Sequence, residues 1–175
     1  MTRTPTALYV AGFTSLVLSG AIFGFFYAWI CSTMWGLDAA DPRVAITAMQ
    51  AMNASVRNIV FAPAFFGTGP VLLVTAGLAL AASHRPAVLV FAAAGLVYVL
   101  GGTVLTMAIN VPMNEALGAT PVPDTAEAAA LIWADYSPRW QVWNTIRTVA
   151  SGISLLLTGV GVFLLGRGTQ DNSAA

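Results

Sequence analysis

Residues 86–114 read PAVLVFAAAGLVYVLGGTVLTMAINVPMN and contain no charged side chain. A helix that crosses a bilayer needs about 20 consecutive, predominantly apolar residues, so this stretch alone is long enough for one crossing. Three further uncharged stretches occupy residues 4–37, 58–83 and 148–166. The sequence therefore predicts four transmembrane helices.

The composition of the whole chain indicates the same fold class. Of its 175 residues, 58% are hydrophobic and 8% are charged, with a mean hydropathy of +0.79, whereas soluble domains carry roughly 25% charged residues. No linker or low-complexity segment divides the chain. We therefore predict one all-α integral membrane domain over residues 1–170 and a short polar tail at residues 171–175.

Capping signals place the connections between the spans. Asp41–Pro42 is typical of a helix start with proline in the first helical position, and it predicts a helix over residues 43–58. A short helix is expected over residues 124–136, and Ser137–Pro138 predicts the start of the fourth span. With a tight turn at His84–Pro86, the expected fold is a four-transmembrane-helix bundle with two extra short helices in the long connections on one face.

Charge and ligand chemistry exclude several function classes. Seven arginines and no lysine stand against seven acidic residues, so the chain has no basic surface for a nucleic-acid partner. A single cysteine, Cys31, and a single histidine, His84, cannot supply the three or four ligands of a zinc site. Glycine-rich phosphate, dinucleotide and flavin signatures are absent as well. We therefore expect no metal and no cofactor.

The arginines also bear on topology. Arg3, Arg85 and Arg167 fall on the side of both termini, and the other arginines fall on the opposite side. Arg57 and Arg147 stand among polar side chains of apolar segments, so we discount them as topology signals. On that basis we expect both termini in the cytoplasm of a bacterial-type membrane.

Polar side chains gather where three apolar runs begin or end. By segment they are Gln50, Asn53 and Arg57; Asn110 and Asn114; and Trp140, Asn144 and Arg147. The last three are spaced i, i+4 and i+7 and therefore share one helical face. Polar groups at membrane depth are costly and usually face the bundle interior. We expect them to line one shared pocket.

Two of these groups also have a plainer interpretation. Arg147 could extend its guanidinium to the lipid headgroups, while Asn144 caps a neighbouring helix. Asn110 and Asn114 could only satisfy the helix end that Pro112 breaks. The carboxylates of Glu115 and Asp135 are candidate acid–base groups or ordinary interfacial charges.

Four segments carry a resemblance to a known family. They are residues 24–29 (GFFYAW), 48–53 (AMQAMN), 106–117 (TMAINVPMNEAL) and 133–147 with its Trp-Tyr-Trp-Asn-Arg series. In this order the chain resembles the anthrone oxygenase (noranthrone monooxygenase) family of small membrane proteins, from about residue 20 to 150.

The resemblance implies an activity that composition and spacing do not show. The characterised members that this chain resembles look like oxygenases: they convert a tricyclic anthrone into an anthraquinone during aromatic polyketide tailoring, without an evident metal or flavin. Many relatives carry histidine directly after the Trp-Asn pair, where this chain has Thr145. If that histidine is a base elsewhere, this chain uses Glu115 or Asp135 instead, or performs different chemistry.

The resulting hypothesis is a cofactor-independent, oxygenase-like membrane enzyme that oxidises a lipophilic aromatic, anthrone-type substrate to a quinone with O2. Its catalytic candidates are Arg147, Asn144, Asn114, Asn110, Glu115 and Asp135. Its candidates for substrate binding are Gln50, Asn53, Tyr27, Trp29, Trp140, Trp143 and Tyr136. Its partners are then the aromatic molecule, O2 and the lipid bilayer, and the sequence leaves homo-oligomerisation open. The alternative is a non-catalytic membrane protein that binds a hydrophobic ligand or supports a partner.

Overall fold

The computed structural model describes residues 5–170, and all regular elements in that range are helical. The elements are α1 (Thr6–Ala28), the π-helical η1 (Trp29–Thr33), α2 (Met34–Asp38), α3 (Pro42–Ser55), α4 (Phe61–Ala81), α5 (Arg85–Tyr98), the π-helical η2 (Val99–Val104) and η3 (Thr106–Asn110), α6 (Val111–Gly118) and α7 (Ala126–Gln170). The polar tail predicted at residues 171–175 lies outside the described residues, as does Arg3.

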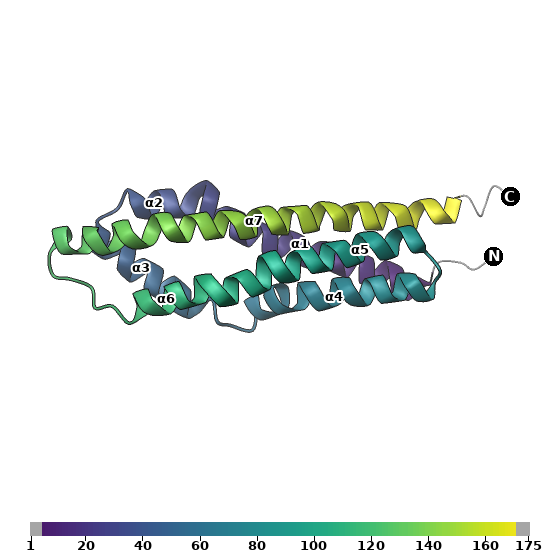
Figure 1. Cartoon of the computed structure of the whole chain (residues 1–175), viewed down its shortest axis with the longest axis horizontal. Coiled ribbons are helices and arrows are strands. Elements are labelled where there is room, and N and C mark those ends of the chain that lie inside the picture. Colours follow the sequence, from purple (N-terminus) through teal and green to yellow (C-terminus); the bar gives the residue numbers. More distant parts are fainter. Residues whose placement is uncertain (1–4, 171–175) are drawn as a thin grey trace.

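Within the described range, four helical stretches are long and apolar enough to cross a membrane: Thr6–Asp38, Phe61–Ala81, Arg85–Gly118 and Ala126–Arg167. They run along the long axis of an elongated molecule, with the start of α1 and the end of α7 at the same end as the α4–α5 turn (Figure 1). The predicted all-α class with four membrane-spanning helices is confirmed, and the chain is an integral membrane protein.

The half of the bundle next to the α4–α5 turn contains an apolar core between α1, α4, α5 and α7. Its largest buried side chains are Leu8, Ile22, Phe26, Phe65, Leu72, Phe91, Tyr98 and Leu165. Large apolar side chains also cover the outside, among them Val17, Leu80 and Phe163. Helices that are hydrophobic on all faces are typical of membrane spans, so the outer face is suited to lipid.

One of the four long members of the bundle, formed by α3 and α4, is interrupted. α4 begins at Phe61, and α3 lies nearly end to end with it across the link at residues 56–60 (Figure 1). Beyond the break, α3 packs with α2, α6 and the first part of α7 around a second core, which contains Trp29, Met34, Ile46, Met49, Leu117, Trp133, Tyr136 and Trp140. The bundle therefore changes one of its four members partway along its length.

The first connection agrees with the sequence. Asp41 Oδ1 accepts a hydrogen bond of 2.9 Å from the backbone N–H of Arg43, with Pro42 at the first helical position of α3. The Arg43 guanidinium lies 2.6 Å from Asp41 Oδ2. These hydrogen bonds from Arg43 hold the pKa of the Asp41 carboxyl at about 2.

The second connection corrects the sequence prediction. No separate short helix precedes the fourth span in this part of the described chain, because α7 begins at Ala126 and continues through Pro138. Ser137 Oγ and Trp133 Nε1 donate to Asp38 Oδ1 at 2.7 Å and 2.9 Å. These bonds hold the helix against α2 on the N-terminal side of the proline, where one backbone hydrogen bond is lost.

Pro112 likewise does not end the third span. The helix passes it as α6, after the π-helical segments η2 and η3, and the N–H of Val111 donates to the carbonyl of Thr106. Local π adjustments are one way in which a membrane helix accommodates proline. π turns are frequent at functional sites, and η3 borders the cavity at the break.

Candidate functional site

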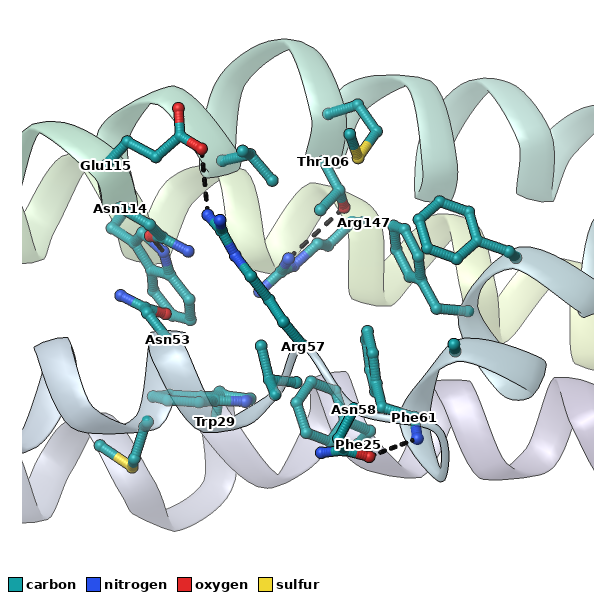
Figure 2. Close-up of a pocket in the computed structure, with 18 of the residues that line it drawn as sticks. Phe25, Trp29, Asn53, Arg57, Asn58, Phe61, Thr106, Asn114, Glu115 and Arg147 are labelled. Atoms are coloured by element: carbon teal, nitrogen blue, oxygen red, sulfur yellow. Dashed lines mark hydrogen bonds and ion pairs between the residues drawn. The ribbon is translucent and has the colours of Figure 1, made fainter. Parts of the chain in front are cut away.

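A cavity of about 570 Å³ lies where α3 and α4 meet, against η3, α6, α7 and the end of the first span (Figure 2). Its apolar lining is Phe25, Trp29, Met52, Val56, Ile59, Phe61, Ala62, Phe65, Phe66, Met107, Val111 and Trp140. Its polar lining is Asn53, Arg57, Asn58, Thr106, Asn114, Glu115 and Arg147. A mostly apolar wall with a few polar groups, at a volume in the range of roughly 300–1,000 Å³, is typical of small-molecule sites.

Arg147 is the buried cation of this cavity. Its side chain is 5% exposed; Nε donates to Asn144 Oδ1 at 3.0 Å and Nη1 to Thr106 Oγ1 at 3.4 Å. Its Cζ lies 4.3 Å from the ring centre of Phe26 and 5.1 Å from that of Trp140. Within the described range no carboxylate oxygen lies within 4.0 Å of it. The cavity wall therefore carries a positive charge without a counter-ion, and the alternative of Arg147 reaching the headgroups is not what the structure shows.

Asn144 stands behind this arginine and is absent from the cavity lining. It is 1% exposed, accepts from Arg147 Nε, and donates from Nδ2 to the carbonyl of Phe26 at 3.3 Å. Its amide thus joins α7 to α1 and fixes the guanidinium from the side away from the cavity.

Asn114 presents its amide at another part of the wall. Its Oδ1 accepts hydrogen bonds from the Tyr136 hydroxyl and from Trp140 Nε1, both at 2.8 Å. Asn53 lies at the same end of the cavity as Asn114 and Glu115 (Figure 2), and its Nδ2 has no hydrogen-bond partner among residues 5–170. Two amides from different helices therefore face the same space.

Asn110 is fully buried, one turn from both Thr106 and Asn114, and does not line the cavity. Neither Oδ1 nor Nδ2 finds a hydrogen-bond partner in the described part of the chain. A buried, unsatisfied polar group destabilises a fold by roughly 1–3 kcal/mol. Such a group in a native fold calls for a partner or a function.

A single ion pair crosses the open side of the cavity. Arg57 Nη2 lies 3.0 Å from Glu115 Oε1, and the two side chains are 62% and 59% exposed. Figure 2 shows Arg57 extending across the cavity from the end of α3 toward Glu115 on α6. Among the described residues, Glu115 is thus the one carboxylate of the cavity lining.

Several residues that the sequence grouped with the site lie elsewhere. Gln50 donates from Nε2 to the carbonyls of Leu117 and Thr120 at 2.8 Å and 2.9 Å, where it satisfies the end of α6. Asp135 is exposed and lies 3.3 Å from Arg139. Consecutive helical residues point about 100° apart, so Asp135 diverges from its buried neighbour Tyr136.

The aromatic candidates divide in the same way. Trp29 and Trp140 line the cavity, whereas Trp143 does not. Tyr27 is 49% exposed and stacks on Phe23, away from the cavity. Tyr136 does not line the cavity; its hydroxyl donates to Asn114 Oδ1 and also lies near the Asn53 side chain.

Sequence reasoning missed the phenylalanine wall and Thr106. Phe25, Phe61 and Phe65 resemble ordinary membrane-span residues, and only the break between α3 and α4 turns them toward a cavity. Thr106 had a usable signal, because it precedes Asn110 by four residues and Asn114 by eight on one helical face.

Among the described residues, no group of three His, Cys, Asp or Glu side chains is placed to hold a metal ion. The polar side chains that line the cavity carry amides, one hydroxyl, two guanidinium groups and one carboxylate.

Three comparisons with known proteins bear on the identity of this chain. A search of curated proteins found no match to this chain, and neither did a search of solved structures. A family model described as anthrone oxygenase matches residues 58–157. This range covers more than half of the chain and runs from the break before α4 to beyond Arg147. The chain belongs to the anthrone oxygenase family.

Proposed function

We propose that this protein is an oxygenase that removes a proton from a lipophilic aromatic substrate of the anthrone type and oxidises the resulting anion with O2. The observation that carries the proposal is the buried guanidinium of Arg147, which faces an aromatic cavity and has no counter-ion among the described residues. A site with this charge favours a ligand that is apolar over most of its surface and anionic at one oxygen.

The same cavity offers a group to accept the proton. Glu115 lines it, and its carboxylate forms an ion pair with Arg57 beside the opening. A positioned base contributes roughly 10²–10⁴-fold to a rate. We assign Glu115 this role in place of Asp135, which lies outside the cavity.

The reaction balances without a further reductant. Glu115 takes one proton from the ring methylene, and the negative charge spreads onto the carbonyl oxygen of the anthrone. The carbanion carbon bonds to O2 and becomes a hydroperoxide on taking up a proton. Loss of water then breaks the O–O bond and the second C–H bond, so that CH2 and O2 become C=O and H2O.

Arg147 and Asn114 are assigned to the developing anion. Donors aimed at the oxygen where negative charge develops are worth roughly 3–4 kcal/mol each in the transition state. Arg147 also holds its orientation before substrate arrives, since Asn144 and Thr106 fix its guanidinium. Trp29, Trp140 and the phenylalanines supply flat surfaces for the rings.

The substrate's route is proposed from the link between α3 and α4. Ile59 and Val60 are 87% and 83% exposed there, next to the cavity. Apolar side chains at this position favour entry from the lipid rather than from water. We place both termini in the cytoplasm of a bacterial-type membrane, which puts the cavity near the opposite membrane surface; reporter fusions at each terminus test this orientation.

The test is turnover by purified protein in detergent. With an anthrone as substrate, O2 consumption and quinone absorbance should rise together at one O2 per quinone, above the background of air oxidation in detergent alone. With ¹⁸O₂, the new carbonyl should carry one labelled oxygen. Binding of the ring system without O2 consumption above background would contradict the proposal and favour a ligand-binding protein.

A further inference from the structure

The orientation of the Asn114 amide is fixed by its two neighbours on α7. Oδ1 receives hydrogen bonds from the Tyr136 hydroxyl and from Trp140 Nε1, each at 2.8 Å. An indole N–H is only a donor, so the atom that faces Trp140 must be the amide oxygen and not the nitrogen.

The amide nitrogen is therefore turned away from α7. Asn114 lines the cavity, and among residues 5–170 its Nδ2 has no hydrogen-bond acceptor. Tyr136, by contrast, is buried and does not line this cavity. It precedes Trp140 by four residues, so both donors project from one face of one helix.

We propose that Tyr136 is a positioning residue: its hydroxyl, together with Trp140, holds Asn114 so that the amide N–H groups donate into the cavity. This inference rests on the proposed function, in which Asn114 binds an anionic oxygen. A donor that is already oriented needs no reorganisation when charge develops on the substrate. Tyr136 thereby contributes to the site without touching the substrate.

A purely structural role is the competing explanation, since polar bonds between helices also stabilise membrane bundles. The two roles differ in how Tyr136 and Asn114 depend on each other. A positioning hydroxyl has nothing to position once the Asn114 amide is gone, so its removal then has no effect on turnover. Loss of a purely structural bond lowers the stability of the fold whether or not substrate is bound.

The experiment is a double-mutant cycle on the full-length protein in detergent. Tyr136→Phe should lower kcat by about 10-fold with little change in KM. Asn114→Ala should lower kcat by about 100-fold. The double variant should match Asn114→Ala. Trp133→Phe is the matched control, because its indole bonds to Asp38, away from the cavity, and it should leave kcat unchanged.

The same cycle is run on equilibrium binding of a hydroxyanthraquinone, followed through the visible absorbance of its phenolate. Tyr136→Phe should raise the pKa of the bound phenol, and it should have no such effect in the Asn114→Ala background. If wild-type protein binds the phenolate with this coupling but oxidises no anthrone, the proposed function fails and the positioning role stands.

Independent losses would overturn the inference. If Tyr136→Phe lowers turnover or binding by the same factor with and without Asn114, or leaves both at wild-type values, Tyr136 does not act through the amide. Should Tyr136→Phe not fold, Asn114→Asp decides, because it keeps an acceptor for both donors and replaces only the cavity-facing nitrogen. Wild-type binding and turnover in Asn114→Asp would overturn the inference, and a loss as large as that of Asn114→Ala would support it.

Discussion

The guanidinium carbon of Arg147 lies 4.3 Å from the centre of the Phe26 ring, between α7 and α1. Trp140 flanks the same group at 5.1 Å, and Asn144 and Thr106 accept its hydrogen bonds. These contacts stabilise a cation through ring faces and neutral oxygens and leave its charge uncompensated. In a membrane protein, such a charge is available to an anionic ligand.

Replacing Arg147 tests whether that charge is used. Arg147→Leu should abolish anthrone oxidation, and Arg147→Lys should restore little, since an ammonium lacks the planar fork of donors. Thermal unfolding should show that the Leu variant is folded, because Arg147 has no carboxylate partner among the described residues that its removal would leave as an unpaired buried charge. The control is His84→Ala at the distant α4–α5 turn, which should retain full activity. Normal turnover by Arg147→Leu would place the active site elsewhere.

A counter-ion installed beside Arg147 separates its charge from its position. Asn144→Ala removes the acceptor of Nε and should lower kcat by about 100-fold. Asn144→Asp puts a carboxylate at the same place and should cost at least about tenfold more, because it neutralises the charge meant for the substrate. Equal losses in the two variants, measured at equal protein stability, would argue against an anion-binding role.

Two of the ion-paired carboxylates, Glu115 and Asp135, provide a matched comparison for the base. Glu115→Gln should lower kcat by roughly 100-fold or more, while Asp135→Asn should leave it unchanged. Both side chains are exposed and paired with an arginine, but only Glu115 lines the cavity. Initial rates of quinone formation measure the difference. Loss of activity in the Asp135 variant alone would reverse the assignment.

The unsatisfied amide of Asn110 is expected to lower the stability of the ligand-free fold. Asn110→Leu removes a buried amide with two unsatisfied atoms and should unfold at the same or a higher temperature than wild type. If an added ligand satisfies this amide, the unfolding temperature of the wild type should rise more with ligand than that of the variant does. A large drop in unfolding temperature for Asn110→Leu, without ligand, would show that the amide is needed for the fold.

The start of α3 predicts a pH dependence outside the membrane. Arg43 lowers the pKa of Asp41 to about 2 from its ordinary value near 3.8. The resulting stabilisation is therefore fully present above about pH 4 and is lost as the pH falls toward 2. Asp41→Asn should lower the unfolding temperature slightly at pH 6, and this difference should disappear near pH 2. A difference that persists at pH 2 would assign it to another cause.

The sequence predicted the fold well because membrane spans depend on length and hydropathy, which are local properties. It predicted the cap at Asp41 for the same reason. It was wrong at Ser137–Pro138 because the bonds of Ser137 and Trp133 to Asp38 come from a segment about a hundred residues away in the chain. A capping pattern alone does not show such partners.

The site was predicted only in part for a similar reason. Asn53, Asn114 and Arg147 line one cavity as the helical spacing indicated, whereas Asn144 and Asn110 share the stripes but lie behind the wall. Gln50 shares a face with Asn53 and still turns to the carbonyls at the end of α6. Helical periodicity gives the direction of a side chain to within a face, and the neighbouring helices decide what it meets there.

The break between α3 and α4 has a kinetic consequence. On the proposed route past Ile59 and Val60 the substrate comes from the bilayer, so its effective concentration would be a mole fraction in lipid and not an aqueous molarity. Diluting proteoliposomes with buffer should then leave the rate per enzyme unchanged at a fixed substrate-to-lipid ratio. Adding empty lipid at constant total substrate should slow it, as expected for catalysis confined to two dimensions.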